Sequence, residues 1–330
     1  DYWHQGGNWA RQFCEEFGLP SAVWQRKGVM RLDDEEVVPS EPLPPLHDYQ
    51  RGAYERLRDL MARRSRGRTA LLSLPTGAGK TRVVVEAICD HLAESAGSGS
   101  VGSVLWIAHS SELQAQAWEC FREVWQVPPR RAGAAPVRRF QPLRLVRLWG
   151  GRDPDTIDDE GEGPEVLVAS VDQLASWSRR APAALERLKK RRFVCAVIDE
   201  AHGVITNEFR AVLEALGFKA ERRWLPAPGA PLLVGLTATP WRMSDEQDAA
   251  LHRFFSNLLV TPTALGAQPV AKLQARGILS HVVPDRIRIP HVPPMTRSQR
   301  DHVERFHELP SEYLDQLAGF AERNREILRR

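Results

Sequence analysis

Residues 74 to 81 read LPTGAGKT, a short glycine-rich segment between two apolar stretches. The stretch 69 to 74 is typical of a buried strand, and the stretch 79 to 95 is typical of a helix. Gly77 and Gly79 let the chain turn so that successive N–H groups point at an anion, and the helix N-terminus adds a partial positive charge. The segment therefore predicts a loop that binds phosphate groups.

Two side chains after the turn complete this prediction. Lys80 would neutralise the terminal phosphates of a nucleoside triphosphate, and the Thr81 hydroxyl would ligate Mg²⁺. The strict pattern for such loops has glycine at position 74, where this chain has leucine. A glycine turn that binds nothing is therefore the alternative. The loop residues expected to bind the nucleotide are Thr76, Gly77, Ala78, Gly79, Lys80 and Thr81.

Two adjacent carboxylates follow a second apolar strand, residues 193 to 198. Parallel sheets place their ligand chemistry at the carboxyl ends of buried strands, where Asp199 and Glu200 are expected to lie. Asp199 would hold Mg²⁺, and Glu200 would orient or deprotonate the water that attacks the terminal phosphate. A helix cap or a solvated acidic turn is the alternative interpretation.

Together these segments resemble the first RecA-like domain of a superfamily 2 helicase of the DEAD/DEAH-box type. Residues 46 to 50, LHDYQ, resemble the family segment that reads adenine upstream of the phosphate loop. The resemblance implies that Tyr49 and Gln50 bind ATP, with Gln50 at the edge of the base. It also implies catalytic roles for Lys80 and Glu200.

Further segments fall in the order of the family's remaining motifs. Residues 104 to 113, 149 to 151 and 166 to 170 resemble segments that touch the nucleic-acid backbone, and 235 to 240 resemble the segment that couples hydrolysis to movement. The residues implied for the nucleic-acid backbone are His109, Ser110, Gly151 and Ser170. Those implied for coupling are His202, Thr237 and Thr239.

Within the superfamily, the chain looks most similar to the motor subunits of type I and type III restriction enzymes and to related DNA-repair helicases. The similarity is carried by the Tyr-Gln pair, by LTATPWR at 236 to 242 and by LQARGILS at 273 to 280. Two positions depart from the family pattern. His47 stands where relatives usually carry an arginine that stacks on adenine, and Ser111 stands where the backbone-contacting segment often carries arginine.

The alternation of strand and helix patterns after residue 46 predicts an α/β fold, which the resemblance specifies as a RecA-like P-loop NTPase domain. Its sheet is expected to be mostly parallel, with helices on both faces. We predict three parts: an accessory segment with a proline-rich linker at 1 to 45, the ATP-binding domain at 46 to 265, and a helical linker at 266 to 330. That linker is expected to lead to a second RecA-like domain absent from this chain.

The predicted activity is that of an ATP-dependent helicase or double-strand DNA translocase that hydrolyses ATP with Mg²⁺. The family's second domain supplies arginine fingers from a segment of the type Gln-x-x-Gly-Arg-x-x-Arg, and the 330 residues contain no such segment. Loss of an arginine finger lowers turnover by about 10³ to 10⁵. We therefore expect this chain to be a fragment that binds ATP and hydrolyses it poorly alone.

Two alternatives to a helicase remain open. One is a nucleotide-controlled clamp or sensor on nucleic acid that signals to a nuclease partner without processive unwinding. The other, less favoured, is a phosphotransferase that uses the same loop. The expected partners are nucleic acid, with DNA favoured over RNA, the second RecA-like domain, and a nuclease or defence complex.

Composition agrees with a cytoplasmic protein that has no membrane partner. Hydrophobic residues make up 42% of the chain, yet no apolar run approaches the roughly 18 to 20 residues that span a bilayer. The four cysteines are scattered without a C-x-x-C pair, which predicts reduced thiols and no zinc site. The net charge of +3 is too small to indicate a partner, and clusters of arginine and lysine fit a solvated surface as well as a phosphate contact.

Overall fold

A computed structural model describes most of the chain. The described residues are 34–37, 43–62, 69–99, 102–126, 141–158, 161–202, 206–218, 231–238, 245–255, 258–266, 268–281, 293–306 and 309–329. The chain divides into two compact units, Leu32–Ser280 as one and Asp1–Arg31 with His281–Arg330 as the other. Thr239 and the segment 1 to 33 lie outside the described residues.

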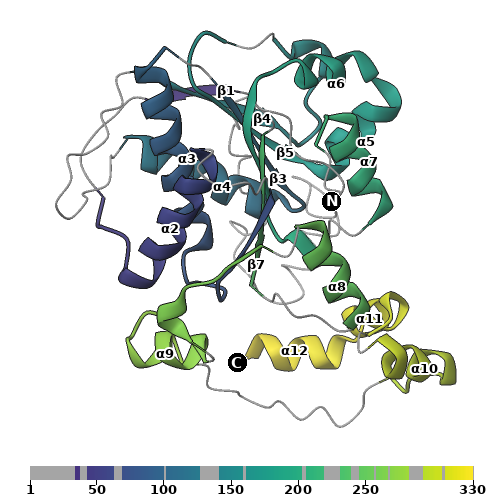
Figure 1. Cartoon of the computed structure of the whole chain (residues 1–330). Coiled ribbons are helices and arrows are strands. Elements are labelled where there is room, and N and C mark those ends of the chain that lie inside the picture. The colour runs from purple at the N-terminus through teal and green to yellow at the C-terminus, as the bar shows by residue number, and fades with distance from the viewer. Residues whose placement is uncertain are drawn as a thin grey trace. The chain divides into compact units, whose positions relative to one another are not determined.

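The larger unit is built on a sheet that has eight strands within the described ranges (Figure 1). In spatial order the strands are β1 (Asp34–Val37), β4 (Leu143–Leu148), β5 (Glu165–Ser170), β3 (Ser103–Ala108), β6 (Phe193–Ile198), β7 (Leu232–Thr237), β2 (Thr69–Ser73) and β8 (Leu259–Val260). Every neighbouring pair is parallel except β1 and β4, which are antiparallel. The predicted α/β fold with a mostly parallel sheet is confirmed.

Helices cover both faces of this sheet (Figure 1). One face carries α2 (Asp48–Met61), α3 (Lys80–Gly97) and α4 (Ser111–Gln126), and the other carries α5 (Val171–Arg180), α6 (Pro182–Lys189), α7 (Asn207–Ala215) and α8 (Asp245–Phe254). Successive strand residues point to opposite faces. Leu72 of β2 thus packs in the cluster that contains Phe121 of α4, whereas Leu71 packs in the cluster that contains Leu174 of α5.

Burial on both faces explains why the central strands are continuous apolar runs. Strands β2, β3 and β7 are buried at every position. The two strand ranges predicted from the sequence, 69 to 74 and 193 to 198, agree with β2 and β6 to within a residue. In β2, β3 and β7 the hydroxyl side chains lie at the strand ends and no charged side chain occurs, and the predicted site residues lie at or next to these ends.

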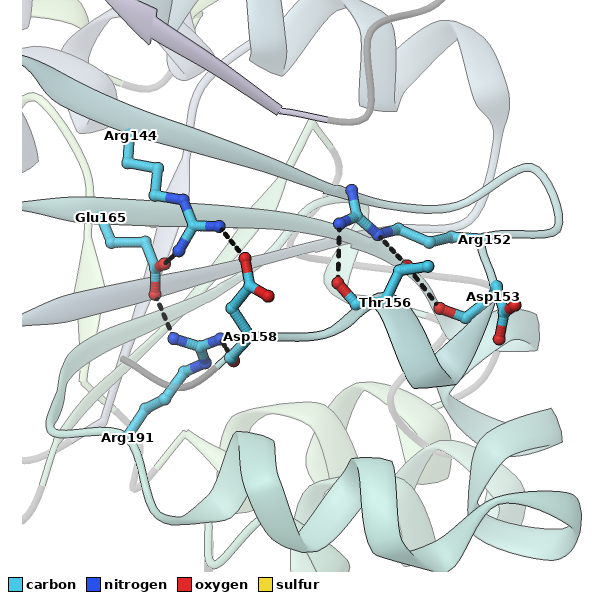
Figure 2. Close-up of polar contacts among 7 residues, drawn as sticks. All are labelled: Arg144, Arg152, Asp153, Thr156, Asp158, Glu165 and Arg191. Atoms are coloured by element: carbon cyan, nitrogen blue, oxygen red, sulfur yellow. Dashed lines mark hydrogen bonds and ion pairs between the residues drawn. The ribbon is translucent and has the colours of Figure 1, made fainter. Parts of the chain in front are cut away.

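Arginine side chains fasten the connection that runs from β4 back to the start of β5 (Figure 2). Glu165, the first residue of β5, is 1% exposed and accepts hydrogen bonds from Arg191 (2.7 Å) and Arg144 (3.2 Å). The same arginines bond Asp158, Arg144 at the carboxylate (2.8 Å) and Arg191 at the backbone oxygen (2.6 Å). The buried Glu165 carboxylate, through these arginines, therefore joins the amino ends of β4 and β5 to the connection between them.

A second set of contacts holds the middle of the same connection around the 3-10 helix η2 (Pro154–Thr156) (Figure 2). Arg152 donates to the backbone oxygen and to the hydroxyl of Thr156, at 3.2 Å each, and Arg187 of α6 donates to the Pro154 oxygen at 2.8 Å. In a strand or a long helix, these backbone oxygens would accept hydrogen bonds from backbone N–H groups. Here arginine side chains supply the donors instead.

The larger unit extends past the C-terminal boundary predicted for the ATP-binding domain. It includes α9 (Pro269–Ala275), and Leu273 of α9 is fully buried in the core. It also includes β1, which lies inside the segment predicted as an accessory region. The predicted domain boundaries remain predictions, and the structure adds these elements to the body of the larger unit.

The C-terminal part of the other unit is helical. It contains α10 (Arg297–Phe306), α11 (Ser311–Ala318) and α12 (Ala321–Arg329). Tyr313 of α11 is buried, and its hydroxyl donates to the Pro293 oxygen at 2.9 Å, which fastens α11 to the segment before α10. None of the helices within the described residues is long and apolar enough to cross a membrane.

Removal of the buried Glu165 carboxylate should lower the stability far more than removal of the exposed Glu162 carboxylate. Glu165→Ala is expected to lower the free energy of unfolding by about 3 to 5 kcal/mol, because it leaves Arg191 buried without its ionic partner. Chemical denaturation measures this quantity. Glu162→Ala, at an exposed position of the preceding turn, is the control and should stay within about 0.5 kcal/mol. Equal effects of the two substitutions would contradict the assigned role of Glu165.

Candidate active site at the carboxyl edge of the sheet

The predicted chemical groups meet because three neighbouring strands end together. In the sheet β7 lies between β6 and β2, with Ser73 opposite Thr237 and Ile198 opposite Gly235. The phosphate loop follows β2, and Asp199 with Glu200 follows β6. The sheet topology therefore places both motifs at one edge.

The loop after β2 has the backbone shape that the sequence predicts. Gly77 and Gly79 have φ angles of 79° and 81°, in the left-handed region that favours glycine, and Gly79 caps the N-terminus of α3. A Cβ atom at Gly79 would collide with the side chain of Gln50. The backbone N–H groups at the start of α3 are thus left open to an anion.

The departure at position 74 has a structural reason. Leu74 is 1% exposed and belongs to the core, and its N–H donates to the Thr237 oxygen at 3.2 Å. The chain therefore continues the strand pairing at this position, and the turn begins only after it. A glycine is not required where the backbone is still extended and the side chain is packed.

Lys80 and the two carboxylates share one electrostatic environment. Burial lowers the pKa of Lys80, opposed by the negative charges of Glu200 and Asp199. Burial raises the pKa of Asp199 to about 6, and the neighbouring Glu200 charge adds to the rise. The site thus holds a partly desolvated cation and a carboxylate whose charge is disfavoured, a combination that a divalent cation or a phosphate would relieve.

Glu200 is held in an unusual backbone conformation. Its φ is 51°, the one positive value for a non-glycine residue in the described part of the chain. His202 Nδ1 lies 3.3 Å from Glu200 Oε2, and this contact is the main cause that lowers the pKa of Glu200. Such strain is typical of sites where a side chain must point in one direction. The geometry holds an ionised carboxylate directly after the end of β6.

His202 also meets the loop after β3. The His202 and His109 rings lie edge to face with centroids 6.4 Å apart. The family resemblance links His202 to Thr237 and Thr239. The observed contacts instead join His202 to Glu200 and His109, and the link to the threonines stays a prediction.

The residues present fit Mg²⁺ bound together with a triphosphate. Mg²⁺ in nucleotide sites takes one or two protein oxygens, and phosphate oxygens and waters complete its shell. Thr81 supplies a hydroxyl at the start of α3, and Asp199 supplies a carboxylate at the end of β6. Within the described residues no cluster of three or more His, Cys, Asp or Glu forms a separate metal site.

The first turn of α2 is bonded directly to the phosphate loop. The Tyr49 hydroxyl and Gln50 Nε2 both donate to the Ala78 oxygen, at 3.0 Å each. Gln50 Oε1 also accepts from the His47 N–H at 2.9 Å. The side chain that the family resemblance places at the edge of the base is thus engaged at both ends by the protein's own groups.

The predicted nucleic-acid residues extend the same edge of the sheet. His109 and Ser110 follow β3, Gly151 follows β4, and Ser170 ends β5; these three strands are neighbours. The Ser110 hydroxyl accepts from the N–H of Leu113 at 3.3 Å in α4, and Ser170 caps α5. Two capped helix N-termini therefore open at one edge, an arrangement suited to phosphate groups.

Gln173 is a site residue that was not predicted from the sequence. Its backbone N–H donates to the Ser170 hydroxyl at 3.0 Å, and its amide accepts from the Gly151 N–H at 3.1 Å and donates to the Arg152 oxygen at 3.4 Å. It joins the glycine turn after β4 to the start of α5. The Ser-x-x-Gln spacing of a helix start was the available signal.

Comparison with known proteins gives a matching family model and similar solved structures. A sequence model of the family described as "Type III restriction enzyme, res subunit" matches residues 43–242. No curated protein matches the chain. Among solved structures, the chain is similar to the UvsW helicase from bacteriophage T4, with 15% sequence identity, a TM-score of 0.38 and 74% of each chain covered. The range that the family model matches contains every site residue predicted from the sequence.

Replacement of the buried Asp199 carboxylate should stabilise the protein when no Mg²⁺ or nucleotide is present. The unfolded pKa of Asp199 is 3.8 and the folded value is about 6. Because the protonated carboxyl of Asp199 is favoured in the folded protein, its contribution to stability is fully present below the unfolded pKa. This contribution is lost as the pH rises through the folded pKa. Asp199→Asn does not titrate, so its free energy of unfolding at pH 7 should exceed that of the wild type by about 2 to 3 kcal/mol.

Denaturation in EDTA between pH 4.5 and 7.5 measures this difference. The gap between Asp199→Asn and the wild type should widen as the pH rises. The exposed Asp172→Asn is the control, and its difference from the wild type should stay constant over the same range. A constant difference for both variants would contradict the burial effect on Asp199.

Proposed function

The chain belongs to the family of the type III restriction enzyme res subunit, and from this premise we propose that it is the ATP-binding motor domain of a nucleic-acid helicase or double-strand DNA translocase. One observation carries the proposal: the phosphate loop and the Asp199–Glu200 pair share one edge of the sheet with two capped helix N-termini. The first two features fit a nucleoside triphosphate, and the helix N-termini fit a phosphate backbone.

We assign the triphosphate to the start of α3. The N–H groups after Gly77 and Gly79 would donate to the phosphates, and the Lys80 ammonium would neutralise them. Thr81 and Asp199 would hold Mg²⁺, which supplies charge neutralisation at the phosphate oxygens. The depressed pKa of Lys80 and the raised pKa of Asp199 support this assignment, because bound charges of opposite sign relieve both.

Glu200 is assigned to the attacking water. Its contact with His202 keeps the carboxylate ionised and fixes its direction, as a base that accepts or orients a water proton requires. The positive φ fixes its backbone as well. We propose that hydrolysis at full rate also requires a second RecA-like domain, which would supply an arginine finger.

We assign one strand of nucleic acid, with DNA favoured, to the edge formed by β3, β4 and β5. The helix N-termini at Ser110 and Ser170 offer backbone donors and partial positive charge, and His109 and the turn at Gly151 follow the same strands. These groups contact a phosphate backbone without base specificity.

Coupling between the two sites is assigned to His202 and Thr237. His202 lies between Glu200 and His109, so it contacts a residue of each site. The Thr237 backbone oxygen pairs with Leu74 just before the phosphate loop. A shift of either residue would therefore move groups at the nucleotide.

Glu200→Gln tests the assignment of the catalytic base. In the full-length protein this substitution should lower ATP turnover by about 10² to 10⁴, because proton transfer to a positioned base contributes that factor. The dissociation constant for ATP should change little, since Glu200 is assigned to the water. Turnover is measured by phosphate release under four conditions: without polymer, with duplex DNA, with single-stranded DNA and with RNA.

The control for this substitution is Glu214→Gln, an exposed position of α7 in the same unit. It should keep wild-type turnover with every polymer. A Glu200→Gln protein that hydrolyses ATP as fast as the control would contradict the assigned chemistry. Wild-type turnover that no polymer stimulates would contradict the motor assignment.

A further inference from the structure

Arg276, at the end of α9, reaches back to the start of α2. Its Nη2 donates to Asp48 Oδ1 at 2.6 Å, and its guanidinium carbon lies 5.7 Å from the centre of the Tyr49 ring. The hydrogen bond from Arg276 is the main cause that lowers the pKa of Asp48. Residues 228 positions apart in the sequence are thus brought together beside the phosphate loop.

The backbone that carries Arg276 is held by its surroundings. Leu273 is fully buried, and its oxygen accepts from the N–H groups of Ile278 (2.9 Å) and Leu279 (3.2 Å). The Leu279 side chain lies against Gly77, where an added Cβ would come within 3.0 Å of Leu279 Cδ2. The segment is therefore packed beside the phosphate loop, and the guanidinium starts from a fixed position.

The same place presents planar groups next to the triphosphate. The His47 ring stacks on the Tyr49 ring, with centroids 5.5 Å apart and planes 12° apart. The Tyr49 hydroxyl bonds Ala78 of the phosphate loop. His47 and Arg276 are both exposed, so each can offer a planar face to a ligand. An imidazole and a guanidinium plane are suitable surfaces for a purine base.

A base beside this loop can also contact groups other than the Gln50 amide. That amide donates to the Ala78 oxygen and accepts from the His47 N–H, so its hydrogen bonds hold α2 to the phosphate loop. His47 and Arg276 are exposed planar side chains that both lie against Tyr49, the residue before Gln50. Arg276 lies beyond residues 43–242, so the family match assigns it nothing.

We propose that Arg276, together with His47, forms the seat for the base of the bound nucleotide, and that the Arg276 guanidinium holds this base by stacking on it. The inference rests on the proposed ATP site and adds to it the residue that holds the base. Asp48 and Tyr49 position the guanidinium, one by the charge-assisted hydrogen bond and the other by the aromatic ring.

Calorimetric titration separates contacts to the base from contacts to the phosphates. ATP and inorganic tripolyphosphate, each with Mg²⁺, are titrated into the wild type, Arg276→Ala and Arg276→Lys. Arg276→Ala should weaken ATP about tenfold, the effect expected for loss of one stacking plane, and should leave tripolyphosphate unchanged. Arg276→Lys keeps the charge beside Asp48 and lacks the plane, so it should also weaken ATP and spare tripolyphosphate.

The matched control is Arg253→Ala, an exposed arginine of α8 in the same unit whose guanidinium donates to the Ala249 oxygen. It should bind both ligands as the wild type does. Thermal unfolding of each variant, followed by circular dichroism, shows whether the fold is retained.

Four results would overturn the inference, and a fifth would overturn the nucleotide site on which it rests. Unchanged ATP affinity in Arg276→Ala would make Arg276 a surface ion pair that only fastens α9. An equal loss for ATP and tripolyphosphate would place its effect on the phosphate loop. Full ATP affinity in Arg276→Lys would show that charge alone matters. If wild-type protein binds tripolyphosphate and ATP equally, no base seat exists; if it binds neither, the proposed nucleotide site fails as well.

Discussion

The structure depends on one constraint, which is that the central strands of a parallel sheet are buried on both faces. Side chains inside such strands must be apolar, so charged groups are left only at the strand ends. The order of β6, β7 and β2 then decides which ends meet. Asp199 and Lys80, far apart in the sequence, become electrostatic neighbours because one strand separates the two that carry them.

The same constraint explains where the protein tolerates strain. Glu200 adopts φ 51° two residues after the end of β6, and its Oε2 lies 3.3 Å from His202 Nδ1. Gly77 and Gly79 make the corresponding turn after β2. The core on both faces stabilises the Glu200 conformation, which is unfavourable for a residue with a side chain, whereas glycine adopts positive φ without strain. The opposite edge of the sheet holds a different device, the buried Glu165 with its arginines, which secures the strands without any part in the chemistry assigned to the site.

Much of this arrangement could be predicted from the sequence because its signals are local. Apolar runs, a glycine turn before a helix and two carboxylates after a strand are each readable within about ten residues. Three features could not be predicted this way. The antiparallel pairing of β1, the use of Gln50 as a fastener for the phosphate loop, and the contact of Arg276 with Asp48 all depend on distant segments. Local patterns carry no information on such pairs, and family resemblance assigned Gln50 to the base.

The most direct test of the central claim is a crystal structure of the protein with Mg²⁺ and a non-hydrolysable ATP analogue. We expect the phosphates at the N-terminus of α3, Mg²⁺ between Thr81 and Asp199, and Glu200 directed at the side of the terminal phosphate opposite the bond that is cleaved. A nucleotide bound away from the ends of β2 and β6, or Mg²⁺ without Asp199 in its coordination sphere or bonded to its waters, would contradict the claim that sheet topology builds this site.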